Sequence, residues 1–295
     1  MPSPRAQDRL SPAPTWWADF RDAWTSPAAW RASMSPSSPL VALEFLTTLR
    51  LRRVRQWDDR TFGAALAWYP LVGLAIGAIL LALDRGLTVL LPNGPASALL
   101  LAALALLSGG LHLDGVADTA DGLAVQGDRA ARLGVMAEGN TGPAGVMALV
   151  LVLLIQWAGL TALEDPVRSA TLLLAPALAR WTVAPVVVLF RPARPRGLGH
   201  ALHRGAWPLA APIATMTAGA ASVVLFGLGG IVLIVVAAVL ALTVAWAASR
   251  LLAGVTGDTY GACIEVSFAA VVLAAAAAGH RGWLELFQVF ELLPS

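Results

Sequence analysis

The chain has 295 residues, of which 58% are hydrophobic and 13% are charged, and its formal net charge is +2. This composition, with a mean hydropathy of +0.72, excludes an ordinary soluble domain and makes the lipid bilayer the expected surroundings. The small net charge gives no support for a nucleic-acid partner. All basic residues are arginines, so a P-loop, which requires a lysine, is excluded. The single cysteine, Cys263, excludes an internal disulfide and a cysteine-rich metal site.

The N-terminal segment differs from the rest of the chain. Residues 1–39 are rich in proline, serine and tryptophan and lack the continuous apolar core of a signal peptide. We expect a disordered arm there, followed by a single transmembrane catalytic domain over residues 40–295. The start of that domain predicts a short amphipathic helix that leads into a cluster of arginines, Arg50, Arg52, Arg53 and Arg55. Such a cluster is typical of the cytoplasmic side of a membrane.

Apolar windows close to the length of a membrane crossing follow one another along the rest of the chain. A transmembrane β-barrel would instead show short segments of alternating hydrophobicity. The windows predict about seven transmembrane helices, at residues 61–83, 96–113, 142–163, 169–190, 208–227, 229–249 and 261–279. The expected fold class is therefore all-α, a polytopic integral membrane protein.

The arginines orient this expected bundle. With a cytoplasmic N-terminus, seven crossings place residues 114–141, 191–207 and 250–260 on the cytoplasmic side. Most arginines from residue 50 onward then lie inside, as the positive-inside rule requires, while the few on the outside are Arg85, Arg168 and Arg281. We therefore expect a multi-pass protein of the cell membrane with its active site on the cytoplasmic face.

The stretch GGLHLDGVADTADGL, residues 109–123, carries Asp114, Asp118 and Asp121 at spacing i, i+4, i+7. On a helix this spacing places the three carboxylates within a stripe about 60° wide. Like charges at a membrane boundary repel one another, so a divalent cation is expected to offset them, and Mg²⁺ commonly joins carboxylates to substrate phosphates. The glycines of this stretch are expected to leave room for a large phosphorylated ligand. The alternative is a solvated loop with helix-capping aspartates.

Two further polar stretches adjoin predicted spans. VMAEGNTGPAG, residues 135–145, either adds an oxygen ligand through Glu138 or is a turn that caps the next helix. GVTGDTYGACIE, residues 254–265, places Asp258 at a helix start and on the same face as Glu265. Asp258 is therefore a candidate for the same site, with a helix N-cap as the alternative.

Arg180 stands alone near the middle of an apolar window. An ionisable residue inside a membrane indicates function, so we expect Arg180 to pair with a substrate phosphate or a carboxylate, the alternative being a structural ion pair. The arginine-rich loop at residues 190–205 either binds phosphate or only sets the topology. His200 and His203 in that loop have the spacing of a metal pair, but no further ligand completes a set. His112, beside a carboxylate, is equally a hydrogen-bond partner, a ligand or a base.

These motifs closely resemble those of the cobalamin synthase family, the adenosylcobinamide-GDP ribazoletransferases. GGLHLDGVADTADGL resembles the hallmark of that family, LEFLTTLRL its N-terminal element, ARW its intramembrane arginine, RPRGLG its loop and TGDTYGA its C-terminal motif. Order and spacing match over about residues 40–275. The segment MAEGNTG departs from the family pattern, because Glu138 replaces an aspartate and two basic positions are lost. If those positions bind phosphate, Arg180 and the loop at 191–204 must compensate.

The resemblance implies a Mg²⁺-dependent phosphotransferase that acts in the last steps of cobalamin assembly. In that reaction a hydroxyl of α-ribazole, or of its 5'-phosphate, attacks the phosphoryl group attached to cobinamide in adenosylcobinamide-GDP, and GMP leaves. The expected metal ligands are Asp114, Asp118 and Asp121, and the expected catalytic residues are Asp118, Asp121, Glu138 and Asp258. The expected substrate-binding residues are His112, Asn140, Arg180, Arg194, Arg196, Thr256 and Thr259. The resemblance also leaves room for a homo-oligomer and for association with neighbouring cobalamin-assembly enzymes.

Two other functions compete with this interpretation. A CDP-alcohol phosphotransferase of lipid synthesis also uses intramembrane aspartates and a divalent metal, but its aspartate motif has a different order from the one found here. A cation-coupled transporter would favour acids near the membrane midplane on discontinuous helices, and an inverted repeat. The sequence indicates neither of these features.

Overall fold

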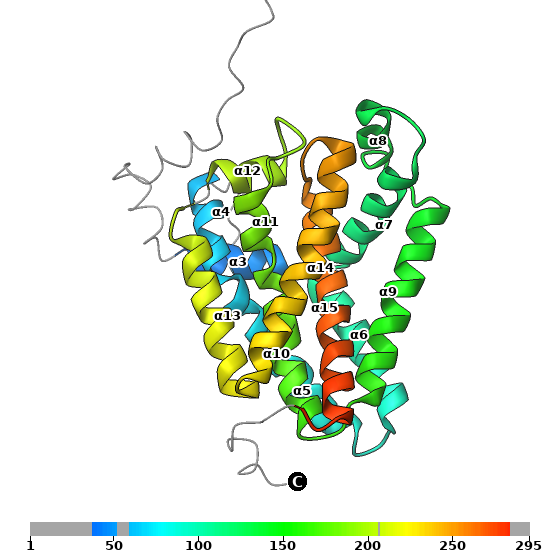
Figure 1. Ribbon diagram of the computed structural model, residues 1–295, viewed down its shortest axis with the longest axis vertical. Coiled ribbons are helices and arrows are strands. Elements are labelled where there is room, and N and C mark those ends of the chain that lie inside the picture. The colour runs from blue at the N-terminus through cyan, green and yellow to red at the C-terminus, as the bar shows by residue number, and fades with distance from the viewer. Residues whose placement is uncertain (1–36, 52–58, 206, 284–295) are drawn as a thin grey trace, which may run out of the picture.

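The computed structural model describes residues 37–51, 59–205 and 207–283. Of the predicted disordered arm, residues 1–36 lie outside this part of the chain, and so do Arg52, Arg53 and Arg55. The described chain is a bundle of helices that run mostly along its long axis (Figure 1). The predicted all-α fold class is confirmed.

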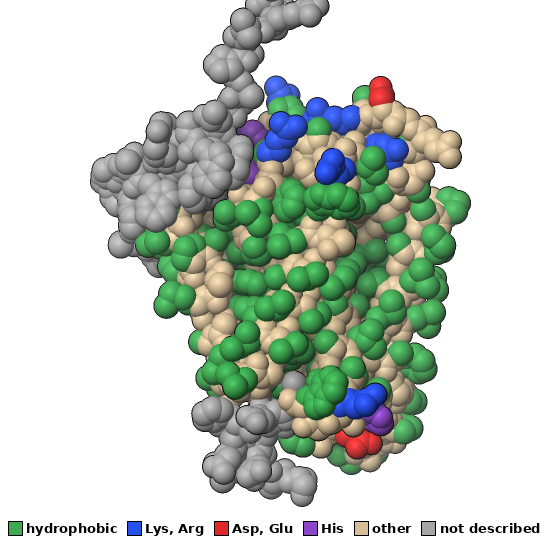
Figure 2. All heavy atoms as spheres, viewed as in Figure 1, with side chains coloured by type: hydrophobic (Ala, Val, Ile, Leu, Met, Phe, Trp, Pro, Cys, Tyr) green, Lys and Arg blue, Asp and Glu red, His purple; other side chains and the backbone are tan. Residues whose placement is uncertain are grey.

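Five helical segments are long and apolar enough to cross a membrane. The first, Asp59–Leu87, is formed by α4 (Asp59–Ala65), η1 (Leu66–Trp68) and α5 (Tyr69–Leu87). A second composite span, Val167–Leu189, is formed by α10 (Val167–Trp181) and α11 (Val183–Leu189). The other three are single helices, α9 (Pro143–Ala162), α14 (Gly229–Leu252) and α15 (Gly257–His280). Figure 2 shows hydrophobic side chains over the middle of the visible face and charged side chains gathered towards its two ends. This distribution is what an integral membrane protein requires.

The expected count of seven straight crossings is not confirmed. The predicted span at 96–113 is broken, because α6 (Asn93–Ser108) and α7 (Leu111–Ala124) meet at a 90° bend. Gly109 and Gly110 form the bend with φ of 63° and 73°, a backbone conformation that glycine adopts without strain. The segment α13 (Ala210–Phe226) is apolar but has only 17 residues, at the lower limit of what a crossing needs, and it is not among the five spans. The described residues thus hold five spans, or six if the bent pair is one span.

The connections divide between the two ends of the bundle as the arginines predicted. The short helices α8 (Arg129–Val135) and α12 (Leu198–Arg204) lie at one end with the α14–α15 connection, and the α13–α14 turn lies at the other (Figure 1). Residues 114–124, predicted on the cytoplasmic side beyond the span at 96–113, belong to helix α7, so the helix predicted for the aspartates is present and the alternative of a solvated loop is not. The predicted short helix near the N-terminus is α3 (Ser38–Leu46), and its side chains Val41 and Leu46 are buried against the bundle.

Helices α5 and α10 pack closely in the bundle core. A methyl group added at Gly73 would lie 2.4 Å from the Cα atom of Ala177, and one added at Gly77 would lie 2.6 Å from the carbonyl oxygen of Leu172. Two glycines four residues apart therefore let the backbones touch, which is how helices associate in lipid, where burial of apolar surface gives little driving force.

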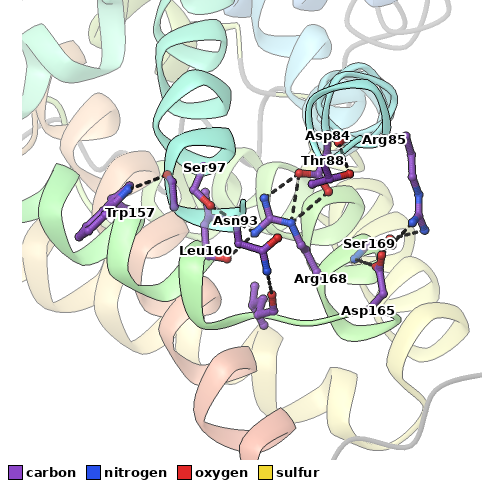
Figure 3. A network of polar contacts seen from close by, with 12 residues as sticks. Asp84, Arg85, Thr88, Asn93, Ser97, Trp157, Leu160, Asp165, Arg168 and Ser169 are labelled. Atoms are coloured by element: carbon purple, nitrogen blue, oxygen red, sulfur yellow. Dashed lines mark hydrogen bonds and ion pairs between the residues drawn. The ribbon is translucent and has the colours of Figure 1, made fainter. Parts of the chain in front are cut away.

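A buried ion pair joins four helices at the end of the bundle opposite α8 and α12 (Figure 3). Arg168 of α10 is 2% exposed, and its Nε and Nη2 atoms donate to the carboxylate of Asp84 in α5 at 2.6–3.1 Å. Its Nη1 atom donates to Ser97 of α6 and to the carbonyl oxygen of Leu160 in α9. Every nitrogen of this guanidinium has a partner, so the charge is compensated within the protein.

Candidate active site

Helix α7 carries the aspartate motif and packs tightly against α15. A methyl group added at Gly115 would lie 2.6 Å from the carbonyl oxygen of Asp258, and one at Gly261 would lie 3.1 Å from the Cα atom of His112. At Gly122, the same addition would meet Met136 at 2.5 Å. The expectation that the glycines around the aspartates leave room for a ligand is therefore wrong for Gly115 and Gly122. They allow close helix packing, which brings the acids of α7 to the first turn of α15.

Four aspartates and one arginine gather where α7 meets α15. Asp118 lies within electrostatic range of Asp114, Asp121 and Asp258, and the guanidinium of Arg194 partly offsets their charge. Asp114 is exposed, while Asp118 and Asp258 are partly buried. The stripe predicted on one helix face is present, and α15 adds a fourth carboxylate to it.

Asp121 has a structural partner that its sequence position does not reveal. Its carboxylate accepts hydrogen bonds from the backbone N–H groups of Gly142 at 2.6 Å and Gly145 at 2.8 Å. These are the N-cap and third residues at the start of α9, so Asp121 caps that helix from α7. The assignment of Asp121 to a metal and to catalysis therefore competes with a cap that already engages both of its oxygens.

The three predicted metal ligands do not form a closed site. Among the residues the structure describes, no three histidine, cysteine, aspartate or glutamate side chains converge closely enough to hold a metal ion. The physical reason is that Asp121 turns towards α9, while Asp114 and Asp118 lie one turn apart on the helix surface. The remaining carboxylates are hard oxygen donors of the kind that Mg²⁺ binds when substrate phosphates and water complete its shell.

The other predicted acid and amide lie further out. Glu138 and Asn140 are both exposed, in the connection between α8 and α9. Of the two interpretations of this stretch, the structure favours the turn before a helix, although the cap itself comes from Asp121. Nothing in the structure brings Glu138 into the group around Asp118.

Thr256 and Thr259 form a capping box at the start of α15. Each hydroxyl accepts a hydrogen bond from the backbone N–H of the other residue at 3.2 Å, and both side chains are buried. Their hydroxyls therefore have a structural role, and binding of substrate by these residues stays a prediction. The predicted alternative for Asp258 is corrected, because Thr256 and not Asp258 is the N-cap. Asp258 accepts a hydrogen bond from the Thr256 hydroxyl and remains partly exposed.

The arginine-rich loop is fixed beside this group. Pro192 pairs with Val255 in an isolated β-bridge, which ties the loop to the α14–α15 connection. Arg194 donates to the carbonyl oxygen of Leu133 at 3.0 Å and lies within electrostatic range of Asp118 and Asp258. Arg196 is exposed. Arg194 is thus the predicted loop residue that the structure brings to the acids.

The second part of the loop gives no support for a histidine metal pair. His200 and His203 both lie on the short helix α12, and burial lowers the pKa of the His203 imidazole to about 4, with His200 acting in the same direction. The described residues supply no third ligand near them. His203 is therefore a neutral, largely buried side chain at neutral pH.

A second polar group lies deeper in the bundle, around Arg180 in the last turn of α10. Arg180 is 1% exposed and lies within electrostatic range of Glu265 and His112, but its guanidinium donates only to the carbonyl oxygen of Pro176 within the described chain. The Nδ1 atom of His112 lies 3.8 Å from the Glu265 carboxylate, which accepts a 2.8 Å hydrogen bond from Gln156. The predicted pairing of Arg180 with a carboxylate is therefore an electrostatic one without a hydrogen bond. Sequence reasoning missed Gln156, a polar side chain in the middle of a predicted span.

A pocket lies between this deeper group and the aspartates. It holds about 530 Å³ of empty space including its opening. Helices from both halves of the chain line it, and its walls are formed by Phe45, Leu46, Phe62, Tyr69, Leu111, His112, Val183, Leu198, Leu202, Gly257, Asp258, Tyr260, Gly261 and Ile264. His112 and Asp258 connect it to the two polar groups.

The five apolar spans and the bent α6–α7 pair define a polytopic membrane protein, in which a pocket adjoins a group of acids. The chain belongs to the cobalamin-5-phosphate synthase family, whose model matches residues 38–276.

Curated relatives agree with this family. The chain is 43% identical over 250 residues to the adenosylcobinamide-GDP ribazoletransferase of Pseudomonas paraeruginosa, a match that covers 81% of this chain and 97% of the relative. It is 36% identical to the enzymes of the same name from Pseudomonas fluorescens, over 79% of this chain and 96% of the relative, and from Geotalea daltonii, over 82% and 97%. No solved structure matches the chain. The protein is therefore a transferase of cobalamin synthesis, and the comparisons favour this over a lipid phosphotransferase or a transporter.

Proposed function

We propose that the chain transfers the adenosylcobinamide-phosphoryl group of adenosylcobinamide-GDP to α-ribazole or α-ribazole 5'-phosphate. A ribose hydroxyl of the acceptor forms a new bond to the phosphorus attached to cobinamide, and GMP leaves with the electron pair of the bond that breaks. The names of the relatives supply the substrates. The observation that carries the proposal is the position of Asp118, with Asp114 beside it on α7 and Asp258 across from it on α15.

Mg²⁺ is the proposed cofactor, with Asp114 and Asp118 as the residues that would hold it. Proteins commonly hold this ion with one or two carboxylates while substrate phosphates and water fill the remaining positions. The chemistry of the gathered carboxylates fits that mode, and Asp121 is left out because the start of α9 engages its oxygens. When bound, the ion supplies charge neutralisation for the phosphates and the leaving group.

Other residues of the protein are proposed to bind phosphate, accept the hydroxyl proton and orient the acceptor. Arg194 lies beside Asp118 and Asp258, so its guanidinium is positioned to bind a phosphate oxygen of the donor and to hold it near the acids. Asp258 lines the pocket and also belongs to the group of acids, so its carboxylate is the proposed acceptor of the hydroxyl proton. Arg180 and His112 lie deeper, where they are proposed to orient the acceptor.

The active site is proposed to face the cytoplasm of a cell membrane. The support is the distribution of arginines, since the α8 and α12 end of the bundle carries the arginine-rich loop and the acids alike. Labelling of single cysteines placed in α8 and in the α13–α14 turn of intact cells tests this orientation. Labelling of α8 from outside the cell would reverse it.

The test of the reaction is release of GMP by purified protein in lipid nanodiscs supplied with Mg²⁺, adenosylcobinamide-GDP and α-ribazole. We expect Asp118→Asn to lower kcat by about 10³-fold, because it removes a charge at the centre of the proposed site. The matched control is Asp128→Asn, which changes an exposed aspartate at the N-cap of α8, where asparagine caps equally well. Release of CMP from a CDP-alcohol in place of GMP would overturn the assignment, and full turnover in a chelator would remove Mg²⁺ from it.

A further inference from the structure

The pocket beside Asp258 has aromatic walls. Phe45 of α3 contacts Phe62 of α4 edge to face, with ring centroids 4.9 Å apart and an interplanar angle of 86°. Phe45 also stacks on Tyr69 of α5 at 6.2 Å and 22°. These arrangements are favourable geometries for aromatic pairs, and all three side chains line the pocket. The walls therefore favour a flat, mainly apolar ligand.

The pocket also contains both tyrosines of the whole chain, Tyr69 and Tyr260. They are 1% and 6% exposed, and neither hydroxyl has a hydrogen-bond partner among the residues described. A buried hydroxyl without a partner is costly, and buried polar atoms in native proteins are nearly always satisfied. A lipid acyl chain would leave both hydroxyls unsatisfied, whereas a ligand with polar atoms on an aromatic ring or a sugar would satisfy them.

His112 adds a third polar side chain to the same pocket. It is 2% exposed, and both of its ring nitrogens lack a hydrogen-bond partner within the described part of the chain. Asp258 lines the same pocket and belongs to the acid group at the membrane surface. The pocket thus combines an aromatic wall with unpartnered polar atoms and a carboxylate that would meet a sugar hydroxyl.

We propose that this pocket binds the planar base of the acceptor nucleoside, with the base against Phe45 and Phe62 and its unsubstituted ring nitrogen facing the hydroxyls of Tyr69 and Tyr260. This inference rests on the proposed function, which supplies the acceptor. The ribose then extends towards Asp258, and its attacking hydroxyl lies on the side of the acids. A guanine would fit less well, because it presents more donors and acceptors than two hydroxyls and one imidazole match.

The test is binding of α-ribazole to the full chain in nanodiscs, measured by calorimetry. This measurement does not depend on turnover. We expect Tyr69→Phe and Tyr260→Phe each to raise the Kd of α-ribazole about three- to tenfold, as loss of one hydrogen bond does. Ribose 5-phosphate, which lacks the base, should bind equally to the wild-type protein and to both variants. The same variants should raise KM for α-ribazole and leave KM for adenosylcobinamide-GDP unchanged.

A second pair of variants guards against loss of folding. Phe62→Leu should weaken α-ribazole binding by about tenfold, since it removes part of the aromatic wall. Phe226→Leu is the matched control, because Phe226 is equally buried but lies in α13, outside the pocket lining, and should leave binding unchanged.

Each outcome separates this inference from the reaction on which it rests. Binding of α-ribazole that responds to the tyrosines, without release of GMP by the wild-type protein, would support the pocket and overturn the proposed reaction. Unchanged Kd values in both tyrosine variants, or a rise in KM for adenosylcobinamide-GDP alone, would overturn the pocket assignment.

Discussion

Helix α10 buries an arginine at each end, and the two have opposite surroundings. Arg168, in the first turn, is 2% exposed, and all of its guanidinium nitrogens donate to Asp84, Ser97 and a carbonyl oxygen. Arg180, in the last turn, is 1% exposed, and within the described chain its Nε and Nη2 atoms have no partner. On this one helix, the arginine in the first turn has all its hydrogen bonds made, whereas the arginine in the last turn does not.

The difference separates a structural charge from a functional one. A buried ion pair with all its hydrogen bonds made holds helices together. Removal of one partner is destabilising because it leaves the other as an uncompensated buried charge. A buried guanidinium with free donors instead holds binding capacity that the protein itself does not use. The unsatisfied arginine lies within electrostatic range of His112, whose ring nitrogens are unpartnered too. His112 lines the same pocket as Tyr69 and Tyr260, whose hydroxyls also lack a partner among the residues described.

The largest effect is expected from removal of the fully hydrogen-bonded arginine. Arg168→Met should lower the free energy of unfolding by about 3–5 kcal/mol, because Asp84 is left as an uncompensated buried charge. The measurement is thermal or denaturant unfolding of the protein in detergent. Arg85→Met is the matched control at the same end, since the Arg85–Asp165 pair spans 2.8 Å but its side chains are 47% and 43% exposed. The control should cost no more than about 1 kcal/mol, and an equal loss in both variants would contradict the comparison.

The next effect concerns the unsatisfied end. Arg180→Met should lower kcat/KM about ten- to a hundredfold, as loss of a charged hydrogen bond to substrate does, while the unfolding midpoint stays near that of the wild-type protein. Steady-state release of GMP together with the unfolding curve provides the check. If Arg180→Met destabilises the protein as much as Arg168→Met, the guanidinium has a structural role and the distinction fails.

A smaller effect is expected at the cap of α9. Asp121→Ala should cost about 1–2 kcal/mol, because the N–H groups of Gly142 and Gly145 lose their acceptor. Hydrogen exchange over the first turn of α9 should accelerate. Asp114→Ala on the same helix should leave that exchange unchanged, because Asp114 is exposed. Unchanged protection in Asp121→Ala, with loss of the activity response to Mg²⁺, would instead make Asp121 a metal ligand.

The smallest effect is a pH dependence of α12. Burial lowers the pKa of His203 from the usual 6.5 to about 4, so between these values the unfolded chain binds a proton that the folded chain does not. Stability from this residue is therefore complete above pH 6.5 and falls as the pH drops towards 4. Hydrogen exchange of α12, corrected for intrinsic rates, should rise from pH 7.5 to pH 5.5, and His203→Gln should remove most of that rise. An equal rise in His203→Gln would assign it to another group.

The long spans and the surface acids were predictable because each depends on local sequence. Hydropathy alone predicted the spans that became α9, α10–α11, α14 and α15, and the spacing of Asp114 and Asp118 predicted their shared helix face. The break at Gly109 and Gly110 was not predicted, because two glycines at the end of an apolar window do not differ in hydropathy from a span that continues. The geometry of the bend requires both residues at positive φ, which sequence spacing does not reveal.

The contacts between distant segments explain the remaining errors. Arg168 was predicted in an outer loop, but Asp84 and Ser97 on two other helices bury it. The capping box formed by Thr256 and Thr259 was not predicted from the family motif, and their binding of substrate stays a prediction. A signal for the pocket was present in the sequence, since Tyr69 and Tyr260 are its two tyrosines, yet nothing local says that they meet.

The cap of α9 comes from another helix, and this affects which substitutions the connection between α8 and α9 tolerates. The first backbone N–H groups of α9 donate to the carboxylate of Asp121 in α7. The residues just before Gly142 are therefore not needed as a cap for that helix. This arrangement instead constrains the residues at Gly142 and Gly145, because an added methyl group would lie 2.6 Å and 2.4 Å from the carboxylate oxygens of Asp121. Substitutions upstream, such as the acidic and neutral residues around Glu138, are therefore tolerated without unravelling the helix that follows.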